Sequence, residues 1–323
     1  MKRALICGVS GQDGAYLAKL LLDKGYQVWG TSRDAQVANF SNLKTLGVLE
    51  RVTQLSMAQT DFRSVLNGLI RSEPDEVYFL SGQSSVGLSF DQPAETMESL
   101  SLGVLNLLEA VRFVGRPIRV YNASSSECFG DVGQHRATED TPFRPRSPYG
   151  VAKASAHWLV TNYREAYGLF ACNGILFNHE SPLRPLRFVT RKIVAAACGI
   201  AEGSSEKLTL GRLDIVRDWG WAPEYVEAMW RMLQAETADD YVIATGHSSS
   251  LADFVSLAFE CVGLDWRDFV VSDPSLFRPL DITHSAGDPS KADRLLNWKA
   301  TAQVRDVVSN LVSAQSAGRW PKA

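Results

Sequence analysis

Near the N-terminus stands Gly8-Val9-Ser10-Gly11-Gln12-Asp13-Gly14, between a short apolar run and a stretch with helical spacing. Glycines in such a turn let the backbone bend tightly and approach a pyrophosphate, which then lies on the N-terminus of the following helix. The glycine spacing differs from that of many dinucleotide-binding turns, and a glycine-rich turn without a ligand is the alternative. Because the turn directly follows the first expected strand, we predict that Gly8, Gly11, Gln12, Asp13 and Gly14 bind a dinucleotide.

The rest of the first half alternates short β-type runs with helical stretches, which is typical of a parallel, doubly wound α/β sheet. We therefore predict a Rossmann-type fold. The expected strands are Ala4–Gly8, Gln27–Ser32, Val52–Leu55, Glu76–Leu80, Arg119–Ala123 and Asn173–Phe177. The expected helices, whose apolar residues recur at helical spacing, are Tyr16–Lys24, Leu102–Phe113 and Tyr149–Tyr167.

The pattern loosens after about Asn178, where loops and prolines become more frequent. A later helix, Glu224–Gln234, and a strand, Tyr241–Ala244, have the pattern of elements that return to the main sheet. We predict a discontinuous Rossmann domain made of residues 1–177 and about 216–247. A smaller substrate-binding lobe is expected to comprise residues from about 178 to 215 and from 248 to 323.

The composition is that of an ordinary globular protein, with 45% hydrophobic and 21% charged residues among 323. The net charge of −3 gives no general attraction to nucleic acid or to an anionic membrane, so local groups have to hold any phosphate. No apolar run approaches the roughly 20 residues that a membrane span needs. The five cysteines are scattered without CxxC pairs, which predicts no disulfide framework, no metal site and a cytoplasmic location.

The end of the second expected strand indicates which dinucleotide binds. An NAD site usually has an acidic residue there, which hydrogen-bonds the ribose hydroxyls. Here the strand ends in Gly30-Thr31-Ser32-Arg33, and the first acid is Asp34. A hydroxyl and a guanidinium suit the 2′-phosphate of NADP, because guanidinium makes charge-assisted hydrogen bonds to phosphate. We predict NADP bound by Ser32 and Arg33; NAD, with Arg33 as a solvated surface residue, is the alternative.

Two further segments predict acid–base chemistry. An expected helix begins with Tyr149-Gly150-Val151-Ala152-Lys153, and the i, i+4 spacing places its tyrosine and lysine on one face. A cation about 4 Å away favours a tyrosinate by roughly 4 kcal/mol, about three pKa units, and a positive nicotinamide ring would add to it. After the strand Arg119–Ala123, where ligands bind such sheets, Ser125 can hydrogen-bond a substrate alcohol and Glu127 shares its face. An ordinary surface pair and a serine-rich capping turn are the alternatives.

Several strings in the chain resemble one family. The glycine turn, the serine–glutamate segment, the tyrosine–lysine pair and Leu80-Ser81-Gly82-Gln83-Ser84 resemble extended short-chain dehydrogenases. Within that group, the chain is similar to the GDP-mannose 4,6-dehydratase family from Met1 to about Trp298. The strings that carry this resemblance are Gly11–Leu17, Arg146–Lys153, Ile175–Pro182, Phe188–Lys192, Arg217–Gly220 and Phe277–Pro279.

The resemblance implies a reaction in which a hydride leaves C4 of a hexose, a proton leaves C5, water leaves C6 and the hydride returns to C6. It implies that Tyr149 is the C4 base and that Lys153 is its electrostatic partner and a ribose ligand. Ser125 is expected to hydrogen-bond the C4 oxygen, and Glu127 to move the C5 proton. The further cofactor ligands that it implies are Leu80, Gln83, His179 and Arg184. The implied GDP-sugar ligands are Ser84, Ser125, Asn178, Lys192, Leu210, Gly211, Arg212, Arg217, Arg278 and Asp281.

Three positions depart from the family pattern. Arg33-Asp34-Ala35-Gln36 has one arginine where the family has two, which bears on NADP binding and on tetramer contacts. Ala58 stands where the family has an aspartate near the adenine, with Gln59 or backbone groups as substitutes. Arg212 and Val216 replace an asparagine and a lysine beside the nucleotide site, so the sugar can differ from mannose.

We predict a GDP-sugar 4,6-dehydratase, with GDP-mannose as the expected substrate and a homodimer or homotetramer as the expected assembly. The alternatives are a GDP-heptose 4,6-dehydratase, a GDP-4-keto-6-deoxy-sugar reductase and a non-catalytic NADP-sensing regulator. The strings Asn178–Pro182 and Arg217–Gly220 favour the dehydratase over the reductase. A regulator typically lacks the tyrosine or the lysine, whereas Tyr149 and Lys153 are both present here.

Overall fold

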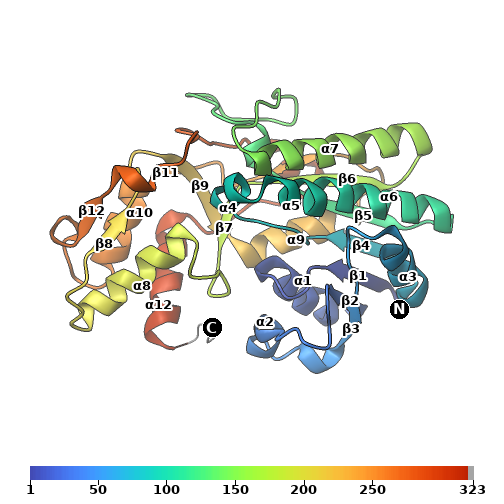
Figure 1. Cartoon of the computed structure of the whole chain (residues 1–323), viewed down its shortest axis with the longest axis horizontal. Coiled ribbons are helices and arrows are strands. Elements are labelled where there is room, and N and C mark those ends of the chain that lie inside the picture. The colour runs from blue at the N-terminus through green and yellow to red at the C-terminus, as the bar shows by residue number, and fades with distance from the viewer. Residues whose placement is uncertain (319–323) are drawn as a thin grey trace.

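A large parallel sheet forms the centre of the protein, whose computed structural model describes residues 1–318. Its seven strands lie in the order β10-β6-β5-β4-β1-β2-β3, and all neighbouring pairs are parallel (Figure 1). The direction of winding reverses between β1 and β4, which is where such sheets bind ligands at their carboxyl ends. The strands are β1 (Arg3–Cys7), β2 (Gln27–Ser32), β3 (Val52–Ser56), β4 (Glu76–Phe79), β5 (Arg119–Ser125), β6 (Ala171–Leu176) and β10 (Tyr241–Ile243).

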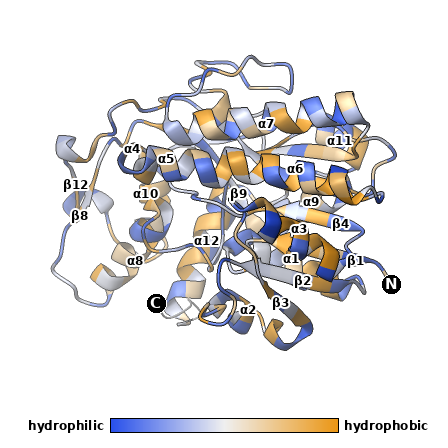
Figure 2. Cartoon of the chain, turned by 45° about the vertical axis from the view of Figure 1, so that its right-hand side comes forward, coloured by the Kyte–Doolittle hydropathy of each residue, from blue (hydrophilic) through white to orange (hydrophobic). Residues whose placement is uncertain are grey.

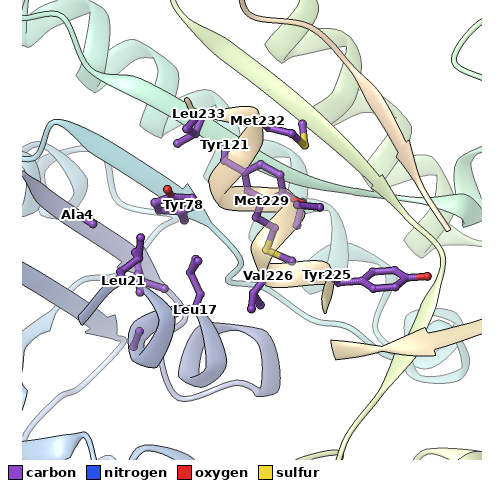
Figure 3. Packing of buried hydrophobic residues seen from close by; sticks show 14 of the residues in the cluster. Ala4, Leu17, Leu21, Tyr78, Tyr121, Tyr225, Val226, Met229, Met232 and Leu233 are labelled. Atoms are coloured by element: carbon purple, nitrogen blue, oxygen red, sulfur yellow. The ribbon is translucent and has the colours of Figure 1, made fainter. Parts of the chain in front are cut away.

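Alternate residues of the central strands are buried under helices on opposite faces of the sheet. Ala4 and Ile6 pack in one cluster with α1 and α9, and Leu5 and Cys7 pack in another with α3, α6 and α7. These helices carry both hydrophobic and hydrophilic residues along their length (Figure 2), and Figure 3 shows how α1 and α9 face each other across their apolar side chains. They are α1 (Gln12–Asp23), α3 (Phe62–Ser72), α6 (Gly103–Val114), α7 (Pro148–Tyr167) and α9 (Ala222–Met232).

A smaller lobe follows the large sheet and has its own core. One sheet has the order β11-β9-β7, and β8 pairs with β12 in another. Side chains of α8, α10 and α12 pack together in a separate hydrophobic cluster. The bounds are β7 (Asn178–Glu180), β8 (Leu208–Leu210), β9 (Val216–Trp221), β11 (Ser248–Ser250), β12 (Val270–Ser272), α8 (Val189–Ala201), α10 (Leu251–Glu260) and α12 (Val304–Ser316).

The remaining helices are short and surround these two parts. They are α2 (Ser41–Thr45), α4 (Val86–Asp91), α5 (Pro93–Met97) and α11 (Ser290–Leu296), together with a π turn (Glu98–Leu102) and 3-10 turns at Leu49–Arg51, Ser126–Cys128, Trp266–Asp268 and Pro274–Leu276. Within residues 1–318, no helix combines enough length and hydrophobicity to cross a membrane. The chain passes from β6 to β7 across a single residue, Phe177, so the two parts adjoin where the main sheet ends.

The predicted Rossmann-type fold is confirmed. The late strand does return to the main sheet as β10, which pairs with β6. Helix α3 was not among the predicted helices, although its apolar residues Val65 and Leu69 are buried. Strand β9 lies in the span that we assigned to the larger domain, yet it pairs with β7 and β11 of the smaller sheet. The domain boundaries stay a prediction, and residues 319–323, at the end of the predicted lobe, lie outside the described range.

Candidate active site

The glycine turn joins β1 to α1, and its geometry requires glycine. Gly8 has a φ of +85°, and a Cβ on it would lie 2.9 Å from the Cα of Ser81. A Cβ on Gly14 would lie 2.4 Å from the carbonyl oxygen of Gly8. Helix α1 begins at Gln12, after Gly11, and no side chain caps its N-terminus. The first N–H groups of α1 therefore lack a side-chain acceptor, which suits an anion at this end of the helix.

The predicted catalytic residues come from the end of β5 and the start of α7. Ser125 ends β5, and the 3-10 turn after it carries Glu127. Tyr149 lies in the first turn of α7, and Lys153 lies one turn further on the same face. A Cβ on Gly150 would lie 2.8 Å from the carbonyl oxygen of Glu127. Glycine at this position therefore lets the start of α7 pack directly against the turn that holds the glutamate.

Burial shifts the pKa of the ionisable groups in this cluster. It raises the pKa of Glu127, although two arginines of the smaller lobe oppose the shift. It lowers the pKa of Lys153 to about 8. It also raises the pKa of Tyr149, although a hydrogen bond with Ser125 opposes that shift. A raised pKa brings a carboxyl group closer to the operating pH, which favours both accepting and releasing a proton in general acid–base catalysis.

Lys153 shares a face of α7 with Tyr149, and its hydrogen bond goes to the backbone. Its Nζ donates a hydrogen bond to the carbonyl of Ala123 at 2.6 Å and lies 5.8 Å from the centre of the Tyr149 ring. Burial is the largest influence on the pKa of Tyr149 in this structure and raises it. The expectation that Lys153 lowers the pKa of Tyr149 in the cofactor-bound site stays a prediction, because helical spacing fixes the face of a side chain but not its hydrogen-bond partner.

Cationic residues of the smaller lobe face this cluster. Arg217 of β9 is buried. Arg278 follows the 3-10 turn Pro274–Leu276 and lines the same cavity. The Oδ1 of Asp281 lies 3.5 Å from the guanidinium nitrogens of both arginines. Asp281 thus holds two guanidinium groups close together, an arrangement that suits a diphosphate.

Two further cations of this lobe lie towards the rim. Lys192 of α8 donates a hydrogen bond to the carbonyl of Thr209 at 2.8 Å. Arg212 donates from Nε to Asp214 at 2.9 Å. The guanidinium of Arg212 is therefore held by a carboxylate of its own loop.

One cavity of about 410 Å³ brings most of the predicted residues together. Among the predicted cofactor ligands, Asp13, Leu80, His179 and Arg184 line it, besides Tyr149 and Lys153. The predicted catalytic and GDP-sugar residues that line it are Ser84, Ser125, Glu127, Tyr149, Lys153, Asn178, Lys192, Leu210, Gly211, Arg212, Arg217, Arg278 and Asp281. The fold thus gathers these side chains in one space, and their individual roles stay predictions.

Several predicted cofactor ligands lie outside this cavity. The amide of Gln83 donates to the carbonyl of Ser85 at 2.8 Å and to Thr96, so it shapes its own loop. Ser32 and Arg33 lie at the end of β2, and Arg33 is exposed. The amide of Gln12 donates to the carbonyl of His179 at 3.2 Å. The glycines of the turn, with Gln12, border α1 instead of the cavity.

Sequence reasoning did not single out Arg187 and Glu180, which also line the cavity. Glu180 is buried, accepts a hydrogen bond from Thr190 at 2.7 Å and lies 3.3 Å from Arg184. Arg187 lies over the ring of Phe188, 5.3 Å from its centre. Glu180 lies within the family-like string Ile175–Pro182, but no spacing or neighbouring residue marked it as a site residue. Arg187 lies between that string and Phe188–Lys192.

Solved structures share this fold at low sequence identity. The dTDP-glucose 4,6-dehydratase of Bacillus anthracis, solved with NAD, superposes with a TM-score of 0.85 at 19% identity, covering 99% of this chain and 98% of that one. RMD of Pseudomonas aeruginosa, solved with NADPH, superposes with a TM-score of 0.79 at 22% identity, covering 98% of this chain and 99% of that one. At such identities the comparison shows the fold.

Sequence relatives show the family. GDP-mannose 4,6 dehydratase 2 of Arabidopsis thaliana is 46% identical over 321 residues, which cover 96% of this chain and 86% of the relative. The GDP-mannose 4,6-dehydratase of Sinorhizobium fredii is 43% identical over 335 residues, which cover 96% and 95%. The family model described as GDP-mannose 4,6 dehydratase matches residues 5–311. The chain therefore belongs to the GDP-mannose 4,6-dehydratase family.

Proposed function

We propose that this protein is a nucleotide-sugar 4,6-dehydratase that converts a GDP-sugar, with GDP-mannose as the first candidate, into its 4-keto-6-deoxy derivative. The observation that carries the proposal is the composition of one cavity. Acid–base residues Glu127 and Tyr149 line one side, and Arg217 and Arg278 line the other. The first pair suits oxidation and elimination on a sugar, and the second suits the diphosphate that links the sugar to a nucleoside. Relatives that bear the name GDP-mannose 4,6-dehydratase support this assignment.

A nicotinamide dinucleotide fits the glycine turn. The turn brings bare backbone to the N-terminus of α1, and Ser81 beside Gly8 has a buried Oγ without a hydrogen-bond partner in the described chain. When bound, this cofactor supplies a hydride acceptor for C4, a hydride donor for C6 and the positive charge of its oxidised ring. The turn would hold the pyrophosphate, and Tyr149 and Lys153 would lie on the side of the ribose and the ring.

NADP is the form that the end of β2 supports. Asp34 does not pair with Arg33 in the described chain; its Oδ1 accepts a hydrogen bond from the N–H of Gln36 at 2.9 Å. The guanidinium of Arg33 is therefore exposed and available to a 2′-phosphate. Arg33→Ala should weaken NADP binding about ten- to a hundred-fold and leave NAD binding unchanged, with exposed Arg63→Ala as the control. Tighter binding of NAD than of NADP by the unmodified protein would contradict this choice.

The chain's own residues carry the proton transfers. Tyr149 takes the proton of the C4 hydroxyl as the C4 hydrogen leaves, and Ser125 holds the C4 oxygen by a hydrogen bond. The resulting C4 ketone makes the C5 hydrogen acidic, and Glu127 removes it. Glu127 then gives this proton to the C6 hydroxyl, which leaves as water. The raised pKa of Glu127 suits both halves of this step.

The two arginines hold the diphosphate. Asp281 keeps Arg217 and Arg278 close together, and a diphosphate offers each of them stronger acceptors than one shared carboxylate does. Lys192 and Arg212 are placed to bind the outer part of the nucleotide. Arg217 is buried, so its guanidinium has little freedom to move. A diphosphate bound to it would therefore fix the sugar relative to Glu127.

We also propose that the protein forms a homodimer through α6 and α7. These helices pack side by side on the outside of the molecule (Figures 1 and 2). Phe113 and Trp158 on them are 73% and 60% exposed, which is unusual for side chains of this size in a monomer. Light scattering should show the mass of a dimer or of a tetramer built from two dimers, and Trp158→Glu should lower that mass. A monomeric unmodified protein would overturn this part.

The activity is tested by supplying the protein with NADP and GDP-mannose. We expect a product that is lighter by one water and shows the absorbance of a 4-keto sugar in alkali. A parallel reaction with a GDP-heptose shows whether the pocket prefers the larger sugar. Consumption of NADPH only when a keto-sugar is supplied would instead indicate a reductase. Cofactor binding without turnover of either GDP-sugar would contradict the dehydratase assignment.

A further inference from the structure

Hydrogen bonds join the start of α1 to β7 and the residue after it, although these segments are far apart in the sequence. The Nε2 of His179 lies 2.9 Å from the Oδ2 of Asp13. The amide of Gln12 donates to the carbonyl of His179 at 3.2 Å and accepts from the hydroxyl of Ser181 at 2.8 Å. The cofactor turn and the first strand of the smaller lobe are therefore fixed to each other through buried polar groups.

The surroundings of His179 define its charge. Its Nδ1 lies 2.7 Å from the carbonyl oxygen of Phe177, and its Nε2 faces the carboxylate of Asp13. Both partners are acceptors only, so both ring nitrogens have to carry a proton. Burial lowers the pKa of His179, but the charge and hydrogen bond of Asp13 outweigh burial and raise it. The same contact keeps the pKa of Asp13 low in spite of burial.

The other charged groups around the pair do not replace either partner. Arg184 lowers the pKa of His179, and the carboxylate of Asp13 partly opposes the lowering of the pKa of Lys153 by burial. Glu180 is bound to Thr190 and Arg184. On the remaining side, the ring of Tyr225 stacks on His179 with the ring centres 4.5 Å apart. Tyr225 projects from α9 and is a buried member of the apolar cluster drawn in Figure 3.

We propose that Asp13 and His179 form a permanently ionised positioning pair, in which the imidazolium cancels the carboxylate at the cofactor turn and fixes β7 against α1. This inference rests on the proposed function and assigns the side chains of both residues a positioning role. An uncompensated carboxylate in the first turn of α1 would repel a pyrophosphate at the same helix end.

The pair also relates the cofactor turn to the substrate side. His179 pairs with Gly220 and Asn178 with Trp219 in the parallel pairing of β7 and β9. Strand β9 carries Arg217, one of the two arginines proposed to hold the diphosphate. The position of α1 is thus transmitted to the substrate-binding strand through one ion pair and two strands.

A double-mutant cycle tests the cancellation of charge. Titrations of NADP binding compare the unmodified protein with Asp13→Asn, His179→Asn and the double variant, and exposed His135→Asn is the control. His179→Asn should weaken binding at least about tenfold, because it leaves the carboxylate uncompensated. Adding Asp13→Asn should restore affinity to within about threefold. If the losses of NADP affinity in the two single variants simply add in the double variant, the proposal is overturned.

Nitrogen NMR of the histidine rings tests the charge state without any cofactor. The signals that disappear in His179→Asn belong to His179 and should be those of an imidazolium across neutral pH. A neutral tautomer in this range would overturn the proposal, even if the variants fold poorly. If the unmodified protein fails to bind NADP, the cofactor assignment fails, whereas the NMR result still decides the state of the pair.

Discussion

The two sides of the cavity are built in different ways. Ser125, Glu127, Tyr149 and Lys153 stand on β5 and α7 of the large sheet, and their surroundings exclude water enough to shift three pKa values. The cations of the smaller lobe differ in their exposure to solvent: Arg217 is buried, whereas the side chain of Arg278 is 38% exposed. The comparison teaches that one side is arranged for proton transfer and the other for holding a charged substrate. Substitutions on the first side should act on turnover, and those on the second on affinity.

The largest effect is expected from the tyrosine. Tyr149→Phe should lower turnover by about 10²–10⁴-fold, because it removes the group that takes the C4 proton. Cofactor affinity and the melting temperature should change little. Tyr167→Phe, at the exposed end of the same helix, is the matched control. Near-normal turnover of Tyr149→Phe would remove this residue from the chemistry.

A second substitution separates the two chemical steps. Glu127→Gln should still permit oxidation at C4 but lower the elimination by about 10²-fold or more, because an amide cannot accept the C5 proton. A single-turnover experiment should therefore show reduced nicotinamide accumulating on the enzyme. Glu95→Gln, exposed on α5, is the control. If hydride transfer is lost as completely as elimination is, Glu127 is not a dedicated base at C5.

The other side of the cavity should respond through affinity. Arg217→Ala removes one of two guanidinium groups from the diphosphate and leaves Asp281 with only Arg278. The Michaelis constant for the GDP-sugar should rise about ten- to a hundred-fold, with a smaller change in turnover. Arg267→Ala, exposed and paired with Asp265, serves as the control. A loss confined to turnover would mean that both sides of the cavity act in the chemistry.

The smallest effect is the pH dependence of kcat/KM. Lys153 is charged below its pKa of about 8, so its charge is lost as pH rises through that value. Glu127 is a base only when ionised, and its pKa is raised, so the base is lost as pH falls through a value above 4.5. We expect a bell-shaped profile that falls about tenfold per pH unit above about 8. A profile that stays flat well beyond pH 8 would show that the charge of Lys153 is not required.

The sequence predicted secondary-structure elements, and the helix face on which a side chain lies, better than it predicted hydrogen-bond partners. The i, i+4 spacing placed Tyr149 and Lys153 on one face of α7, as the structure has them. It did not indicate that Lys153 bonds the carbonyl of Ala123, because that contact depends on how β5 packs against α7. The ionised state of His179 was equally hidden, since its partner Asp13 lies 166 residues away.

The strand β9 shows the same limit at the level of the fold. Its apolar and aromatic pattern fits a strand of either sheet, and only the pairing with β7 and β11 places it in the smaller one. The family strings located Arg217 within this strand but gave no distance from it to Glu127. Long-range packing, which no local pattern encodes, decides both points.

The central claim is that one molecule of sugar loses a hydride at C4 and regains it at C6 in the same active site. GDP-mannose that carries deuterium at C4 tests it directly, with the product analysed by mass spectrometry and NMR. We predict a 4-keto-6-deoxy product with the deuterium on its C6 methyl group and no net change in the nicotinamide pool. Loss of the deuterium to a stoichiometric amount of reduced cofactor, or its release to solvent, would contradict the claim.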